Sequence, residues 1–122
     1  MPGIPLKLVD PELRLTMVES RQRRVSFLSS AIRELSLTET LVVGERLEGV
    51  VRQFAGRFDA VVARCAGDIG YVVGIGAHLV RPGGVVIASG PPKEHRLPAG
   101  EWVTVPGAWP SETRRFALFT AT

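Results

Sequence analysis

The chain has 122 residues, of which 45% are hydrophobic and 22% are charged, a composition that excludes fibrous and disordered classes. The formal net charge of +3 permits an anionic partner such as RNA but does not require one. One cysteine, Cys65, excludes an internal disulfide and a cysteine-based metal cluster, and it fits a cytoplasmic protein. We expect no signal peptide, and no apolar run approaches the ~20 residues of a membrane span.

The first half of the chain alternates between helix and strand patterns. Residues 3–9 predict the tail of a helix, and the alternating apolar residues of 13–19 predict a strand. Ser20 is a suitable N-cap for a following helix. Apolar residues then recur at spacings of three and four, as on one helix face, at Val25, Leu28, Ile32 and Leu35. Next we expect a strand at 40–43 and a helix at 45–54.

The second half begins with the most apolar strand pattern of the chain. Residues 58–63 are apolar enough to predict burial on both faces, as in parallel sheets. A helix is predicted at 69–80, although its glycines weaken it. A turn at 81–84 and a second buried strand at 85–88 follow.

The end of the chain changes pattern. Residues 91–100 are polar and contain prolines, which predicts a loop, and 101–105 and 115–120 predict a closing antiparallel pair. The alternation of strands and helices before this pair predicts a mostly parallel, doubly wound α/β sheet. We expect one domain that comprises residues 1–122.

Ligands of open α/β sheets bind in a crevice beyond the carboxyl ends of the strands. This rule selects Glu19-Ser20, Gly44–Glu48, Arg64-Cys65-Ala66 and Ser89-Gly90. Glu19 ends a predicted strand, where a carboxylate can accept both ribose hydroxyls of a nucleoside. The alternative is a carboxylate that only stabilises the start of the next helix. Arg64 ends the most apolar strand and is either a structural ion-pair partner or a crevice residue that faces an anion.

Nucleophilic and metal chemistry have little support in the sequence. Cys65 needs a base within hydrogen-bonding reach to be a nucleophile, and nothing places His78 or His95 beside it. A buried, inert thiol is therefore the favoured interpretation. No spacing of histidines and carboxylates indicates a metal site.

Two groups of basic residues are candidates for binding phosphates. They are Lys93, His95 and Arg96 in one predicted loop, and Arg114 and Arg115 at the start of the last strand. Trp102 and Trp109 are candidates for stacking on RNA bases, but packing in the core or at a sheet edge is the favoured role for both.

Several stretches match the motifs of one family. They are Pro2-Gly-Ile-Pro-Leu6, Met17-Val-Glu-Ser-Arg-Gln-Arg-Arg-Val-Ser-Phe-Leu28, Arg46-Leu-Glu48, Phe58-Asp-Ala-Val-Val-Ala-Arg64, Leu79-Val-Arg-Pro-Gly-Gly84 and Glu112-Thr-Arg-Arg-Phe-Ala-Leu118. With these motifs the chain resembles the catalytic domain of the 16S rRNA guanine-N7 methyltransferases, the RsmG or GidB family. The resemblance covers nearly the whole chain.

The resemblance implies a Rossmann-like class I methyltransferase fold with S-adenosylmethionine as cofactor. Glu19 would match the family's acidic residue that binds the ribose. Leu47 and Glu48 would match the pair beside the adenine. Arg64 would match the arginine at the cofactor and substrate end of the crevice. Arg114 would match a basic residue that contacts rRNA. The implied partner is 16S rRNA or the small ribosomal subunit. No catalytic residue is assigned, because the exposed lone pair of guanine N7 needs no general base.

Two departures from the family pattern matter for function. The family's glycine-rich cofactor loop and first strand would precede Pro2, so we expect an N-terminally truncated domain whose sheet lacks its first strand. Ser89-Gly90 stands where the family usually has lysine and glycine. An incomplete sheet would expose strand edges and favour self-association. The alternative to an enzyme is therefore a non-catalytic remnant or binding module that keeps the methyltransferase fold.

Overall fold

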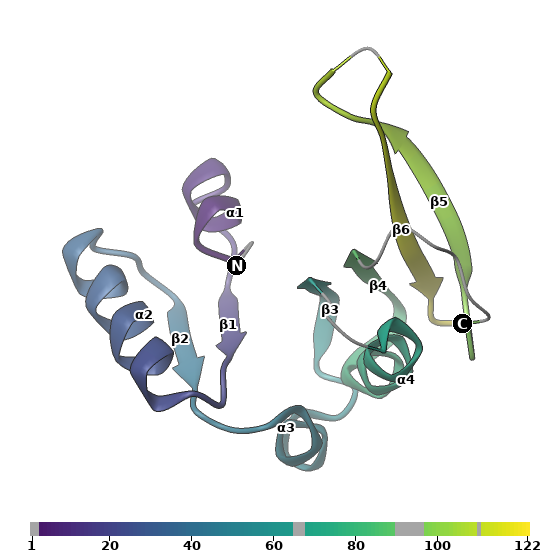
Figure 1. The fold of residues 1–122 in the computed structure, drawn as a ribbon. Coiled ribbons are helices and arrows are strands. Elements are labelled where there is room, and N and C mark those ends of the chain that lie inside the picture. Colours follow the sequence, from purple (N-terminus) through teal and green to yellow (C-terminus); the bar gives the residue numbers. More distant parts are fainter. Residues whose placement is uncertain (1–2, 65–67, 90–96, 110) are drawn as a thin grey trace. The chain divides into compact units, whose positions relative to one another are not determined.

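The computed structural model describes residues 3–64, 68–89, 97–109 and 111–122. Helices and strands alternate along most of this chain (Figure 1). The elements are α1 (Gly3–Val9), β1 (Leu15–Val18), α2 (Gln22–Glu34), β2 (Thr40–Val43), α3 (Leu47–Phe54), β3 (Phe58–Arg64), α4 (Ile69–Leu79), β4 (Val80–Ser89), β5 (Glu101–Pro106) and β6 (Thr113–Thr120). They fall into two compact units, a first unit of Met1–Gln53 and a second unit of Phe54–Thr122.

The first unit contains a two-stranded parallel sheet. Strands β1 and β2 are in register from Leu15 opposite Thr40 to Val18 opposite Val43. Helix α2 packs against β2 through the apolar face that its spacing predicts, and Leu28 on this face is buried. The helix therefore forms because its apolar stripe is removed from water, which contributes more than its intrinsic helix propensity.

A buried lysine joins α1 to the start of β1. Only 2% of Lys7 is exposed, and its ammonium group donates to the backbone carbonyl of Pro11 at 2.6 Å and to that of Leu13. Both carbonyls belong to the segment that connects α1 with β1. Because a buried charge needs partners, these bonds fix the path of the connection.

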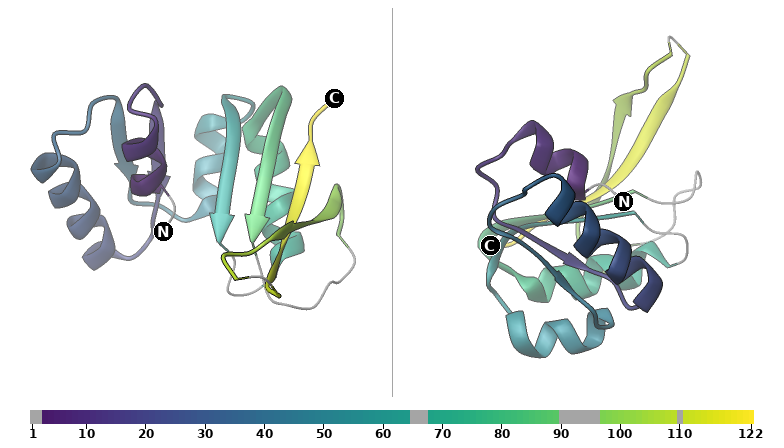
Figure 2. Two further views of the ribbon diagram at one scale, coloured as in Figure 1. Left: turned by 90° about the horizontal axis from the view of Figure 1, so that it is seen from above. Right: turned by 90° about the vertical axis from the view of Figure 1, so that its left-hand side faces the viewer.

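The second unit contains a four-stranded sheet in the order β3-β4-β6-β5. Strands β3 and β4 are parallel, whereas β6 is antiparallel to both β4 and β5. Helix α4 covers one face of β3, β4 and β6, which lie side by side in Figure 2. The core between helix and sheet consists of Ile69, Val73, Ala88 and Ala117, with Leu97, Trp102 and Phe119 packed around it.

A glycine lets α4 approach β4 closely. A Cβ atom added to Gly76 would lie 2.8 Å from Cγ1 of Val86, which is itself fully buried. Any larger side chain at this position would push the helix away from the sheet. Gly74, on the same helix, has open space where its Cβ would be.

The start of β4 contains a bulge where the sequence predicts a turn. The register with β3 shifts from Phe58 opposite Val80 to Ala60 opposite Val85, so the segment Arg81–Gly84 projects from the ladder. Gly83 provides the turn with a positive φ of 83°. Ala121 closes the bulge, because its carbonyl accepts from the N–H of Gly83 and its N–H donates to the carbonyl of Gly84, both at 2.9 Å.

The predicted α/β alternation and the closing antiparallel pair are confirmed. The described strands form two sheets, and among them β1 and β3 each pair on one side only. The expectation of one domain stays a prediction.

Two local predictions were wrong. The N-cap of α2 is Arg21, which makes no side-chain capping bond, and not Ser20. The strand β3 is not buried on both faces, since Asp59, Ala60, Val62 and Arg64 are exposed. It is an edge strand in its sheet, and sequence hydrophobicity does not distinguish edge strands from central ones.

Candidate cofactor and nucleic-acid site

The candidate residues fall into two groups, one in each unit. In the first unit, Glu19 directly follows β1, and its backbone N–H donates to the carbonyl of Val43 at 3.0 Å. Glu19 thus lies beside the end of β2, at the carboxyl edge of the parallel pair. Its side chain is half-buried. This is the position in which open α/β sheets bind ligands.

The carboxylate of Glu19 also has a structural role. Its Oε1 accepts the backbone N–H of Arg21 at 3.1 Å, just before α2 begins. The alternative interpretation of Glu19 as a helix-start carboxylate therefore has a geometric basis. The two roles are compatible, because a carboxylate offers about four acceptor positions on two oxygens.

Leu47 and Glu48 form the first residues of α3, which begins four residues after the end of β2. Leu47 is half-buried and Glu48 is exposed. The helix starts two residues later than the sequence predicts. A carboxylate in the first turn is favourable there because it faces the positive end of the helix dipole.

In the second unit, Arg64 lies at the carboxyl end of β3 and is exposed. It is in register with Ser89, the last residue of β4, and Ser89 is in register with Phe116 of β6. These three residues form a row across the carboxyl edge of β3 and β4, which we call the edge row. Ser89 occupies the position where the resemblance leads one to expect a lysine.

Arg114 and Arg115 lie just beyond the edge row. They precede Phe116 in β6 and lie opposite Val105 and Thr104 of β5. Nη2 of Arg114 lies 2.9 Å from Oε1 of Glu112. The structure therefore brings Arg64 and Arg114 to the same end of one sheet, as ligand binding at that edge requires.

The two tryptophans differ in environment. Trp102 is half-buried against the core of the second unit, which confirms the packing role predicted for it. Trp109, at the tip of the β5–β6 hairpin, is 74% exposed, so packing is the wrong interpretation for this residue. The sequence held one signal for this difference: Trp109 lies between Gly107 and Pro110 in a turn-like segment, whereas Trp102 lies within a strand.

Several sequence candidates lie outside the described residues, namely Cys65, Gly90, Lys93, His95 and Arg96. His78 is described, and it is exposed in the last turn of α4. Within the described ranges, no group of three or more histidine, cysteine, aspartate or glutamate side chains could hold a metal ion. The helices in those ranges also include none long and apolar enough to cross a membrane.

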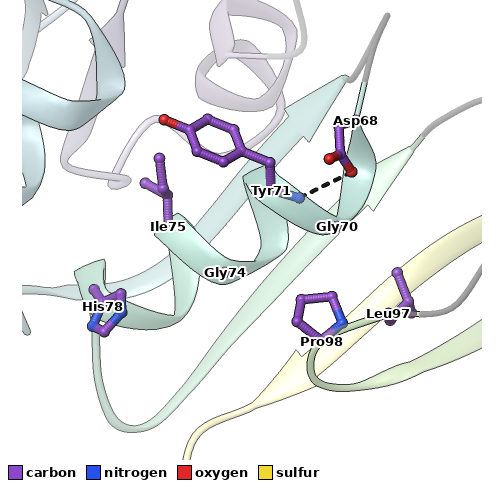
Figure 3. Close-up of a pocket in the computed structure, with 8 residues that line it drawn as sticks. All are labelled: Asp68, Gly70, Tyr71, Gly74, Ile75, His78, Leu97 and Pro98. Atoms are coloured by element: carbon purple, nitrogen blue, oxygen red, sulfur yellow. Dashed lines mark hydrogen bonds between the residues drawn. The ribbon is translucent and has the colours of Figure 1, made fainter.

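An open hollow of about 630 Å³ runs along α4. Figure 3 shows Tyr71 and Ile75 on one side of the helix and Leu97 and Pro98 across from it. The N–H of Tyr71 donates to Oδ1 of the N-cap Asp68 at 3.2 Å. The residues that line the hollow include none of the candidate residues at the strand ends.

Comparison with known proteins gives a family match. The family described as rRNA small subunit methyltransferase G matches residues 1–95. A ribosomal RNA small subunit methyltransferase G of Stenotrophomonas maltophilia is 38% identical over 104 residues, which cover 82% of this chain and 48% of that protein. The enzyme of the same name from Sorangium cellulosum is 36% identical over 105 residues, which cover 84% of this chain and 44% of that protein. The chain spans about half the length of the curated relatives it matches.

Among solved structures, the fold is similar to that of a candidate methylase from Haemophilus influenzae. The TM-score is 0.69 at 9% sequence identity, and the match covers 96% of this chain and 72% of the other. At this identity the likeness concerns the fold alone. It confirms the expected Rossmann-like class.

Proposed function

The chain belongs to the rRNA small subunit methyltransferase G family, and from that membership we propose that it serves methyl transfer from S-adenosylmethionine to guanine N7 of small-subunit (16S) rRNA. The observation that carries the proposal is the position of Glu19. Its half-buried carboxylate stands at the carboxyl end of a parallel strand, where this class of fold binds nucleosides.

The residues around Glu19 fit the nucleoside part of the cofactor. Oε1 of Glu19 accepts one N–H from Arg21, which leaves the carboxylate further acceptor capacity for two ribose hydroxyls. Leu47 offers an apolar surface for the adenine ring, and Glu48 an acceptor for its exocyclic amine. We therefore propose these three residues as the nucleoside-binding set.

Arg64 is proposed to act at the reactive end of the crevice. It is exposed at the carboxyl end of β3, where a guanidinium can hold a carboxylate or a phosphate through parallel hydrogen bonds. Both ligands are available in this reaction, one on the cofactor and one on the RNA. Arg114, which lies beyond the edge row, is proposed to contact the RNA backbone.

The chemistry requires positioning rather than proton transfer. Bound S-adenosylmethionine supplies an electrophilic methyl group, and neutral guanine presents a lone pair at N7. The task of the chain's residues is to hold the base in line with that methyl group and to exclude water, which is catalysis by proximity and orientation. The absence of an assigned general base is consistent with this mechanism. A protein acting on 16S rRNA would work in the cytoplasm, which we propose as its location.

Calorimetric titration with S-adenosylhomocysteine tests the proposal at its first step. We expect saturable binding in the micromolar range, about 8 kcal/mol of binding free energy. The Arg64→Gln variant should bind more weakly, whereas Arg33→Gln, which changes an exposed arginine on α2, should bind as the wild type does.

A folded chain that binds no S-adenosylhomocysteine would contradict the proposal for this chain. The non-catalytic remnant or binding module would then be the better description. If the cofactor product binds, methylation of small-subunit rRNA or of the ribosomal particle becomes the next measurement. Position mapping of the methyl group would show whether guanine N7 is the acceptor.

A further inference from the structure

We propose that Trp109 stacks on an unpaired RNA base while Arg114 and Arg115 contact the adjoining phosphates. The inference rests on the proposed function, because it identifies how the same edge of the sheet takes hold of RNA. It makes the described part of the β5–β6 hairpin tip, residues 107–109, 111 and 112, an RNA-binding element in its own right. The partner is single-stranded RNA, such as a loop or a bulge.

The exposure of Trp109 is the first argument. An indole that is 74% exposed leaves a large apolar surface in water, whereas Trp102 on the same hairpin is half-buried in the core. Exposing such a ring costs the free energy that its burial would contribute, so a binding role accounts for its position. Stacking on a base would cover the ring, and every RNA base has a suitable face.

The tip holds Trp109 in a defined backbone position. The N–H of Glu112 donates to the carbonyl of Trp109 at 3.0 Å, and the N–H of Gly107 donates to the carbonyl of Glu112 at 2.8 Å. Gly107 also packs closely, since an added Cβ would lie 2.5 Å from Cγ of Glu112. These two bonds restrict the backbone of Trp109 before any partner arrives, which lowers the entropy cost of binding.

The hairpin carries this tip beyond the carboxyl edge of its sheet. The described pairing of β6 with β4 reaches Phe116 opposite Ser89, and the pairing of β6 with β5 reaches Thr113 opposite Pro106, nearer the tip of the hairpin. Figure 1 shows the hairpin extending past the arrowheads of β3 and β4. RNA that approaches Arg64 at this edge therefore lies on the side of the sheet toward which the tip projects.

The charges beside Trp109 favour RNA over an apolar protein surface. Segment 107–115 contains two arginines and one glutamate, so its net charge is positive. The pairing of Arg114 with Glu112 at 2.9 Å holds the guanidinium next to the turn. Ala108 and Ser111 near Trp109 are small and add little apolar surface beside the ring.

The test measures binding of a labelled single-stranded RNA of about ten nucleotides, a length within the site sizes of such proteins. Fluorescence anisotropy should show that Trp109→Ala weakens binding about tenfold, while Trp109→Phe retains much of the affinity. Phe27→Ala is the matched control, because Phe27 is 69% exposed on α2 and its loss should leave the affinity unchanged. Circular dichroism of each variant verifies folding.

A second readout follows the indole directly. In a Trp102→Phe background, Trp109 is the only tryptophan, and single-stranded RNA should quench its fluorescence where a duplex of the same sequence does not. The inference is overturned if Trp109→Ala binds RNA with wild-type affinity. It is also overturned if the wild-type chain binds no RNA, and a protein partner then becomes the alternative.

Titration of the same samples with S-adenosylhomocysteine keeps the two proposals distinguishable. Intact cofactor binding without a Trp109 effect on RNA contradicts only the stacking role. Trp109-dependent RNA binding without cofactor binding contradicts only the proposed methyl transfer.

Discussion

The carboxylate of Glu19 accepts the backbone N–H of Arg21 at 3.1 Å, across the junction between β1 and α2. This bond satisfies the backbone N–H of the N-cap residue Arg21, although the first turn of α2 has no side-chain cap. The residue proposed to bind the ribose therefore also shapes the turn that presents it. Substitutions of Glu19 must separate these two roles.

Glu19→Gln is the substitution that separates them. The glutamine carbonyl can still accept from Arg21, so the melting temperature should change little. The loss of the negative charge should weaken S-adenosylhomocysteine binding about tenfold or more, because hydrogen bonds to charged groups contribute about 1.5–3 kcal/mol. Calorimetric titration measures this effect. Glu34→Gln, an exposed position on α2, is the control, and equal affinities of the two variants would argue against the ribose role.

The two helix glycines Gly76 and Gly74 should respond oppositely to alanine. A Cβ at position 76 would meet Val86 at 2.8 Å, so Gly76→Ala should lower the free energy of unfolding by about 1–3 kcal/mol. Gly74→Ala enters open space and should raise it by up to about 1 kcal/mol, because alanine is the better helix former. Denaturant unfolding of both variants is the measurement, and equal midpoints would contradict the close packing of α4 on β4.

Replacement of Lys7 should destabilise the first unit. Lys7→Met leaves the carbonyls of Pro11 and Leu13 without the ammonium donor, at a cost of about 1–3 kcal/mol. Arg14→Met is the matched control, since the ion pair of Arg14 with Glu39 is largely exposed and contributes less than about 1 kcal/mol. Thermal melting compares the two, and a larger loss in Arg14→Met would show that the buried bonds are unimportant.

Self-association through a sheet edge remains a proposal, and β3 is where we expect it. Among the described strands β3 pairs only with β4, and Val62 on it is 45% exposed. Val62→Lys should reduce concentration-dependent association seen by light scattering, because charged residues protect strand edges. Phe27→Lys is the control, because it removes an exposed apolar side chain that lies on helix α2 and not on a strand. If Phe27→Lys abolishes association and Val62→Lys does not, the edge is not responsible.

Much of the fold could be predicted from the sequence because most helices and strands have a short-range hydrophobic pattern of their own. The apolar stripe of α2 and the alternation in β1 depend on residues close together in the chain, and both elements formed where they were expected. Strand burial was harder to predict for a physical reason. The exposure of Val62 depends on which strands lie beside β3, and hydrophobicity records only that the residue suits a buried strand.

In the candidate site, too, some features could be predicted from the sequence and others could not. Glu19 and Arg64 could be placed at strand ends from the sequence, because the end of an apolar run marks the end of a strand. The exposure of Trp109 was predicted wrongly, because tryptophan is usually at least partly buried and its turn-like neighbourhood in the sequence was given less weight than that tendency. The helix-start interpretation of Glu19 was also open from the sequence, but its partner, the backbone N–H of Arg21, depends on the path of the chain between β1 and α2.

The two hydrogen bonds between Ala121 and the bulge of β4 have a practical consequence for anyone who engineers this chain. Ala121 directly follows β6 and belongs to no strand itself, yet its backbone forms hydrogen bonds with both Gly83 and Gly84. Trimming it would release the bulge at the start of β4, at the opposite end of the strand from Ser89. Affinity tags and reporters should therefore be appended after Thr122, with Ala121 kept in place.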